Sequence, residues 1–234
     1  IKKALKNWEK YNSKVQFFHV GTQSEREEMH EYLKIPYEKI KIIPLGVDHD
    51  FFKPSVDKDL TRTRVLSELK IPNQKYFFHV SEMNFARKNQ IRLAEAYEMA
   101  RKNGLKHNLI IAGKHVPQIK KKIGHLPGIF FLDWVTNKQL LQLYQGAEAF
   151  VLPSIHEGFG IPLVESMCCG VPCISTNKHS PKHIIEDAGI LINPYDVSEI
   201  CNSMLDLSKD PNLLNQLSEK SLKRSEFFSW KKYA

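Results

Sequence analysis

The chain has 234 residues, of which 42% are hydrophobic and 26% charged, and its formal net charge at pH 7 is +8. This length allows one large or two small domains, and the composition is ordinary for a globular protein. No run of apolar residues approaches the ~20 that a helical membrane span needs, so we expect no such span.

Charge and cysteine content narrow the classes of partner and compartment. A basic protein can face nucleic acid, an anionic membrane surface or a phosphorylated ligand. The lysine-rich segments, Ile1–Lys10 and Lys120–Lys122, lack interleaved aromatic residues for stacking on bases, so a solvated helix face explains them and we expect no nucleic-acid partner. The four cysteines lack metal-ligand or disulfide spacing, which indicates reduced core thiols and a cytoplasmic protein. They are Cys168, Cys169, Cys173 and Cys201.

Short apolar runs alternate along the chain with amphipathic segments. The runs predict strands at Val15–Val20, Lys41–Ile43, Tyr76–Val80, Asn108–Ala112, Ile129–Leu132, Ala149–Leu152, Pro172–Ser175 and Ile190–Ile192. The amphipathic segments predict helices such as Ser24–Lys34, Asn89–Lys102, Asn137–Gln145, Ile161–Cys169 and Ser198–Leu207. This alternation is typical of βα units, so we predict an α/β fold: a Rossmann-like parallel sheet with helices on both faces.

Residues 44–63 interrupt this rhythm with two prolines, a glycine, four aspartates and no apolar period, which predicts a linker. Residues 1–43 read helix, strand, helix, strand, which cannot close a core, so we expect the C-terminal remnant of a preceding domain. We expect residues 64–234 to form a second, complete Rossmann-like domain that ends in C-terminal helices. Because the chain opens on Ile1 without a signal-peptide pattern, we expect it to begin inside a longer protein.

Two short motifs follow in chain order. Asp48-His49-Asp50 has a D-x-D form that can bind metal, but it belongs to the linker, so we expect no metal site there. Arg87 and Lys88 come just before a predicted helix, where cations oppose the helix dipole unless an anion lies between them and the helix. This position points to a phosphate site, and a surface pair of cations is the alternative.

The most informative segment is Pro153–Glu165, between a buried strand and a helix. Gly158 and Gly160 permit positive φ and close backbone approach. The N–H groups of Phe159, Gly160 and Ile161 would lie at the helix N-terminus, where amides and the dipole hold a diphosphate. Loops at the carboxyl ends of parallel strands are also where open α/β sheets bind ligands.

Two carboxylates, Glu157 and Glu165, frame this loop. Acidic side chains would repel an anion bound at the helix start, so their presence there needs a reason. They have one if they accept hydrogen bonds from sugar and ribose hydroxyls. The alternative is that Glu165 complements the helix dipole and that Glu157 is a solvated loop residue.

Several motifs together resemble the family-4 retaining glycosyltransferases. His156–Glu165 resembles their E-x7-E motif, whose common form is EGFG-x-P-x-x-E. Lys39–Asp48 resembles the KI-x-VIPNGVD element before the interdomain linker, and Arg87-Lys88-Asn89 resembles the RKN ending of the phosphate loop in one branch. Glu186–Asp196 is similar to GDAGLLVDPxD, and Phe228-Ser229-Trp230 to the FSW motif. The resemblance covers nearly the whole chain in the right order.

The resemblance implies the GT-B architecture, with this chain as its C-terminal, donor-binding domain. It implies that Glu157 is the catalytic residue, a carboxylate that contacts the transferred sugar near the reacting centre, and that Glu165 binds the ribose hydroxyls. The other donor-binding residues that it implies are Arg87, Lys88, Gly158, Phe159, Gly160 and Ile161. Glu82 departs from the family, because many relatives carry arginine there.

The implied reaction is retaining transfer of a sugar from a GDP- or UDP-sugar, with no cofactor and no metal. The acceptor would be a glycan or a lipid-linked hydroxyl, bound through the other domain, and the enzyme would be a hexosyltransferase, with mannose as one candidate sugar. We expect a cytoplasmic location, and the basic surface suggests the inner membrane face. The alternatives are a non-catalytic nucleotide-sugar-binding domain and a basic nucleic-acid-binding α/β module.

Overall fold

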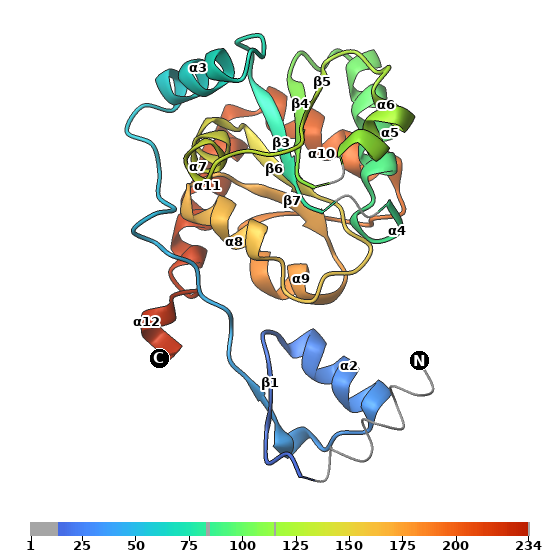
Figure 1. Ribbon diagram of the computed structural model, residues 1–234, viewed down its shortest axis with the longest axis vertical. Helices are drawn as coiled ribbons and strands as arrows, with labels where there is room; N and C mark the ends of the chain where they lie inside the picture. Colours follow the sequence, from blue (N-terminus) through green and yellow to red (C-terminus); the bar gives the residue numbers. More distant parts are fainter. Residues whose placement is uncertain (1–13, 83–84, 115, 234) are drawn as a thin grey trace.

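Six parallel strands form the central sheet, in the order β5-β4-β3-β6-β7-β8 (Figure 1). They are β3 (Tyr76–Val80), β4 (Asn108–Ala112), β5 (Ile129–Leu132), β6 (Ala149–Leu152), β7 (Cys173–Thr176) and β8 (Gly189–Ile192). The computed structural model describes residues 14–82, 85–114 and 116–233. The parallel pairing confirms the predicted Rossmann-like α/β fold, and the ends of these six strands lie within one residue of their predicted positions.

Helices cover both faces of the sheet, because alternate strand residues point to opposite faces. Tyr76 and Phe78 point into one core, whereas Phe77 points into the other. The first core is covered by α3 (Lys58–Glu68), α7 (Asn137–Gly146), α8 (Ile161–Cys168) and α9 (His179–Ile185). The second is covered by α5 (Gln90–Lys102), α6 (Val116–Ile123), α10 (Val197–Lys209) and α11 (Pro211–Ser225). The four cysteines are free and buried in these cores, as predicted.

The order of the strands reverses between β3 and β6. From β3 the chain moves outward through β4 to β5, and from β6 it moves outward in the opposite direction through β7 to β8. The loops that follow β3 and β6 therefore diverge at a topological switch point, which is where ligands bind in open α/β sheets.

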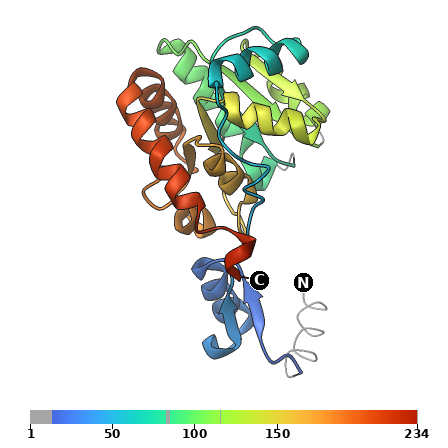
Figure 2. The same cartoon turned by 90° about the vertical axis from the view of Figure 1, so that its left-hand side faces the viewer.

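A small N-terminal lobe (residues 14–43) lies beyond one end of this sheet domain (residues 58–228), as Figure 2 shows. It contains β1 (Phe18–Val20), α2 (Gln23–Leu33), the 3-10 turn η1 (Tyr37–Lys39) and β2 (Ile40–Ile42). Its buried apolar residues are Val20, Ile35 and Ile40. The strand predicted at residues 15–20 is shorter in the structure, because β1 pairs only with the three residues of β2. Residues 1–13 lie outside the described residues.

The predicted linker is helical at its end. No helix or ladder strand occurs from residue 44 to residue 57, but α3 begins at Lys58, so residues 58–63 are a correction to the prediction. The Asp57 side chain accepts a hydrogen bond from the N–H of Leu60 and caps this helix. The apolar period is missing because only Val65 and Leu66 of α3 are buried. Polar capping therefore starts a helix that periodicity does not reveal.

The C-terminal segment returns to the linker. The N–H of Val47 donates to the carbonyl oxygen of Phe228 at 3.0 Å, and α12 (Trp230–Tyr233) follows close to the linker (Figure 1). Figure 2 shows the same segment between the sheet domain and the N-terminal lobe. A Cβ at Gly46 would collide with the backbone of Trp230, so this close approach requires glycine. Within the described ranges, no helix has both the length and the apolar character that crossing a bilayer requires.

Candidate functional site

The loops after β3 and β6 meet at the switch point. The N–H of Ile155, in the loop after β6, donates to the carbonyl oxygen of Arg87 at 2.8 Å. Arg87 and Lys88 end the short helix α4 (Phe85–Lys88), directly before α5. The two predicted motifs, separated by about 70 positions in the chain, are therefore neighbours in space.

A buried ion pair joins the two loops. Nζ of Lys88 lies 2.6 Å from Oε1 of Glu157, and their side chains are 11% and 5% exposed. The hydroxyl of Ser154 donates to the same carboxylate oxygen at 2.6 Å. A buried carboxylate needs such partners, because an unpaired charge away from water is costly. The residue predicted to contact phosphate is thus paired, in this structure, with the residue predicted to contact the sugar.

Asn89 fixes the position of the pair. It has φ 61° and its backbone forms the N-cap of α5, where the sequence predicts the first helical residue. Its Nδ2 donates to the carbonyl oxygens of Pro153 at 2.9 Å and Pro194 at 2.6 Å, and its Oδ1 accepts from Arg92. One buried side chain therefore holds the loops after β3, β6 and β8 together.

The start of α8 has the backbone geometry of an anion-binding helix N-terminus. Gly160 is the N-cap with φ 103°, and Ile161 is the first helical residue. Among the described residues, no acceptor is found for the N–H groups of Gly160 and Ile161, as expected of a first helical turn. Gly158 is not one of the glycines with positive φ, which corrects that expectation. A Cβ at Gly158 would lie 3.3 Å from Oε1 of Glu25, which belongs to α2 of the N-terminal lobe.

The side chain of Phe159 packs in the core, whereas its backbone belongs to the loop before α8. Its ring is buried and packs edge-on against Phe228, with centroids 5.9 Å apart. A Cβ at Gly21 would lie 2.5 Å from Cδ2 of Phe159, so the N-terminal lobe closes directly over this ring. The ring thereby anchors the loop that carries Glu157.

Glu165 lies one turn into α8 and accepts a hydrogen bond from the hydroxyl of Tyr144 at 2.8 Å. Burial raises the pKa of Glu165 above its ordinary value, and the Tyr144 hydroxyl partly opposes this shift. The carboxylate is therefore oriented by α7 but incompletely hydrated, which prepares it to accept hydrogen bonds from a ligand hydroxyl.

A neutral histidine supports the loop after β3. His79 is fully buried, and burial lowers its pKa to about 4, with the positive charge of Lys88 acting in the same direction. Nδ1 lies 2.8 Å from the carbonyl oxygen of Val151, which can only accept, so the proton is on Nδ1. Nε2 then accepts from the hydroxyl of Ser81, whose oxygen accepts from Nε2 of Gln90.

Four further residues of this site have no role predicted from the sequence: Asn89 and Ser154, which lie in the predicted motifs, and Tyr144 and His79, which lie outside them. Asn89 carries a signal, since asparagine tolerates positive φ and stands beside the predicted cations. Tyr144 and His79 carry none, because each belongs to an apolar segment that reads as core.

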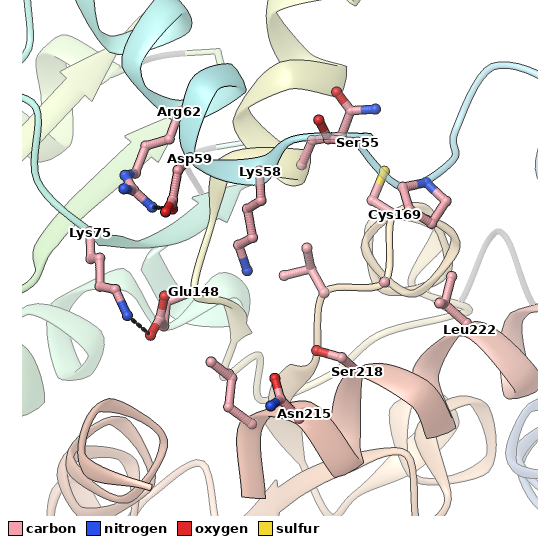
Figure 3. Close-up of a pocket in the computed structure, with 15 residues that line it drawn as sticks. Ser55, Lys58, Asp59, Arg62, Lys75, Glu148, Cys169, Asn215, Ser218 and Leu222 are labelled. Atoms are coloured by element: carbon pink, nitrogen blue, oxygen red, sulfur yellow. Dashed lines mark hydrogen bonds and ion pairs between the residues drawn. The ribbon is translucent and has the colours of Figure 1, made fainter. Parts of the chain in front are cut away.

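A cavity lies at the opposite end of the strands from the switch point, and Figure 3 shows the residues that line it. It has a volume of about 340 Å³ and is lined by residues of α3, α7 and α11. Lys75 and Glu148, which pair at 2.9 Å, come directly before β3 and β6. The cavity therefore lies at the amino ends of these strands, and none of the predicted donor-binding residues lines it.

Comparison with known proteins places these features in a family. The family model described as "Glycosyl transferases group 1" matches residues 62–224. O-antigen chain mannosyltransferase B of Escherichia coli is 28% identical over 212 residues, which are 88% of this chain and 55% of that protein. MMP alpha-(1->4)-mannosyltransferase of Mycolicibacterium hassiacum is 25% identical over 84% of this chain and 46% of its own length. The chain thus spans about half the length of these curated relatives.

The fold also matches solved structures. The crystal structure of Anabaena HepE in complex with UDP-glucose superimposes with a TM-score of 0.80, covering 93% of this chain and 61% of that one. The sequence identity is 18%, so this likeness bears on the fold alone.

Proposed function

The chain belongs to the group 1 glycosyl transferases, and on this premise we propose that it is the donor-binding half of a retaining GT-B enzyme. The observation that carries the proposal is the buried pair of Lys88 and Glu157, held between the two switch-point loops beside the N-terminus of α8. A cation, a helix dipole and an acid then converge where an open α/β sheet binds its ligand.

In the proposed complex, the donor diphosphate lies against the first amides of α8 and takes the ammonium group of Lys88 from Glu157. Arg87 adds a second cation on the same loop. The negative charge that develops on the leaving diphosphate is then neutralised by Lys88, Arg87 and the dipole of α8. We propose that transfer needs no metal for this reason.

The two acids take different parts of the donor. Glu165, oriented by Tyr144, accepts hydrogen bonds from the ribose hydroxyls of a GDP- or UDP-sugar. Glu157 lies beside the transferred sugar and steadies it at the reacting carbon. Retention follows if the acceptor hydroxyl attacks from the face that the diphosphate leaves, with a phosphate oxygen taking its proton.

The acceptor wall belongs to the other half of the enzyme, of which the N-terminal lobe is the last part. We propose a glycan or lipid-linked acceptor and a cytoplasmic enzyme at an anionic membrane surface, because the chain has a net charge of +8. Mannose is a candidate sugar, because two relatives are named mannosyltransferases.

A transfer assay with excess EDTA tests this proposal. A full-length parent protein that contains this chain is expected to transfer sugar equally well with and without EDTA, whereas the 234-residue chain alone transfers it at a negligible rate. Activity lost with the chelator and restored by Mg²⁺ or Mn²⁺ would contradict the metal-free mechanism. Transfer by the chain alone at the rate of the parent would show that no separate acceptor wall is needed.

A further inference from the structure

Three metal-ligating side chains meet where the N-terminal lobe touches the sheet domain. They are Glu28 on α2, His156 in the loop after β6, and His179, the first residue of α9. Oε1 of Glu28 lies 2.7 Å from Nδ1 of His179, and Oε2 lies 3.2 Å from Nε2 of His156. The one ligand atom that each residue can offer lies within 4.8 Å of the other two.

This set of side chains has the chemistry and spacing of a zinc site. Two imidazole nitrogens and one carboxylate are ligands that Zn²⁺ accepts, at about 2.0–2.2 Å each. Atoms at that distance from one tetrahedral ion lie roughly 3.3 Å apart. The carboxylate of Glu28 lies 2.7 and 3.2 Å from the two imidazole nitrogens, close to this value, and all three ligand atoms lie within 4.8 Å of one another. Side-chain rotations that bring the two imidazoles to one carboxylate oxygen would complete the coordination. In the part of the chain that the structure describes, no second group of three such residues converges.

The group can be reached by an ion. The side chains of Glu28, His156 and His179 are 29%, 45% and 34% exposed. Glu28 and His156 also line a cavity of about 440 Å³ between α2 and the loop after β6. Glu25, a second carboxylate, lies on the same cavity wall and adds negative charge that favours a cation. A fourth ligand, water, can enter from this cavity.

We propose that Glu28, His156 and His179 form a Zn²⁺ site that ties the N-terminal lobe to the sheet domain. Glu28 belongs to the lobe and the two histidines to the sheet domain, so a bound ion cross-links the two parts. His156 precedes Glu157, and the ion therefore also fixes the loop that carries the buried ion pair. This site is separate from the proposed sugar transfer, which uses no metal.

Isothermal titration of the tag-free chain with Zn²⁺ tests the site, with Mg²⁺ and Ca²⁺ as comparison ions. We expect one Zn²⁺ per chain and no comparable binding of Mg²⁺ or Ca²⁺. Glu28→Gln and His179→Ala should each raise the Kd for Zn²⁺ roughly tenfold or more, since even residues that only orient a ligand cost about that much. Glu31→Gln and His183→Ala, one turn further along the same helices, serve as matched controls and should leave the Kd unchanged.

Co²⁺ gives a second readout, because its visible absorption reports tetrahedral coordination. The wild-type chain and the two controls should show the tetrahedral spectrum, and the two ligand variants should lose it. The thermal midpoint of each variant without metal establishes that it folds. Zn²⁺ affinity that is the same in folded Glu28→Gln and His179→Ala as in the wild type would overturn the proposal, as would the absence of saturable Zn²⁺ binding.

Discussion

Glu165 shows how a single residue can be prepared for a ligand at a cost to the protein without ligand. Its carboxylate is partly withdrawn from water and accepts a hydrogen bond from the hydroxyl of Tyr144. Two ribose hydroxyls would supply the hydrogen bonds that water no longer supplies. In the proposed complex, the same geometry that weakens the charged form in the free protein would therefore favour nucleotide binding.

Replacing Glu165 with alanine should weaken binding of UDP or GDP. The loss of charge-assisted hydrogen bonds to ribose costs roughly 1.5–3 kcal/mol, which is about tenfold or more in Kd. Isothermal titration calorimetry measures the change, and Glu219→Ala, at an exposed position of α11, is the control. An unchanged Kd for Glu165→Ala would remove this residue from the site.

Glu165→Gln should behave differently in the absence of nucleotide. Burial raises the folded-state pKa of Glu165, so the folded protein holds this proton more tightly than the unfolded chain does. The wild type therefore loses stability as pH rises from the unfolded pKa through the folded pKa, and the glutamine variant is spared this loss. Urea unfolding at pH 4 and pH 7 should show the variant gaining stability relative to wild type at the higher pH. A difference that is the same at both pH values would contradict this account.

At the scale of elements, hydrophobic patterning predicts the sheet domain well. Its four inner strands are buried on both faces and its two edge strands, β5 and β8, are partly buried. Such short apolar runs have sharp limits in the sequence. α3 escapes the prediction because most of its surface faces solvent, and the limits of β1 depend on its partner strand rather than on its own residues.

The candidate site is only half predictable for a similar reason. Motif and spacing bring out the loop from Gly158 to Ile161 and the two cations. The pairing of Lys88 with Glu157 requires the parallel neighbours β3 and β6, which only the folded sheet brings together. Nothing in the sequence around Tyr144 indicates that its hydroxyl meets Glu165.

Asn89 joins the loops that follow β3, β6 and β8, so two substitutions at this position test its side chain and its backbone conformation separately. Asn89→Gly should lose about 2 kcal/mol of unfolding free energy, because the carbonyl oxygens of Pro153 and Pro194 lose their donor. Asn89→Ala should lose roughly 1 kcal/mol more, because alanine is disfavoured at φ 61°. Urea unfolding measures both losses. Equal stability of the glycine and alanine variants would show that the backbone conformation carries no cost.

At the scale of the whole molecule, the N-terminal lobe and the sheet domain meet beside the candidate site. Gly21 of the lobe packs on Phe159, and the hydroxyl groups of Thr22 and Ser180 lie 2.7 Å apart across the contact. The C-terminal segment pairs with the linker, through Val47 with Phe228 and Ser229, and so packs against the chain that connects the two parts. In the proposed enzyme, a donor bound at the switch point would therefore lie next to this junction.

The proposed donor site is tested most directly by measuring how much Lys88 contributes to the affinity of the protein for a nucleoside diphosphate. Lys88→Met alone would leave the buried Glu157 unpaired, so the comparison is between Glu157→Gln and the double variant Lys88→Met/Glu157→Gln. Isothermal titration in EDTA with UDP and GDP, and with uridine and guanosine, measures binding to both. Removing Lys88 should weaken diphosphate binding about tenfold or more and leave nucleoside binding unchanged. Equal losses for nucleotide and nucleoside would contradict the assignment of Lys88 to the phosphates, and with it the donor site.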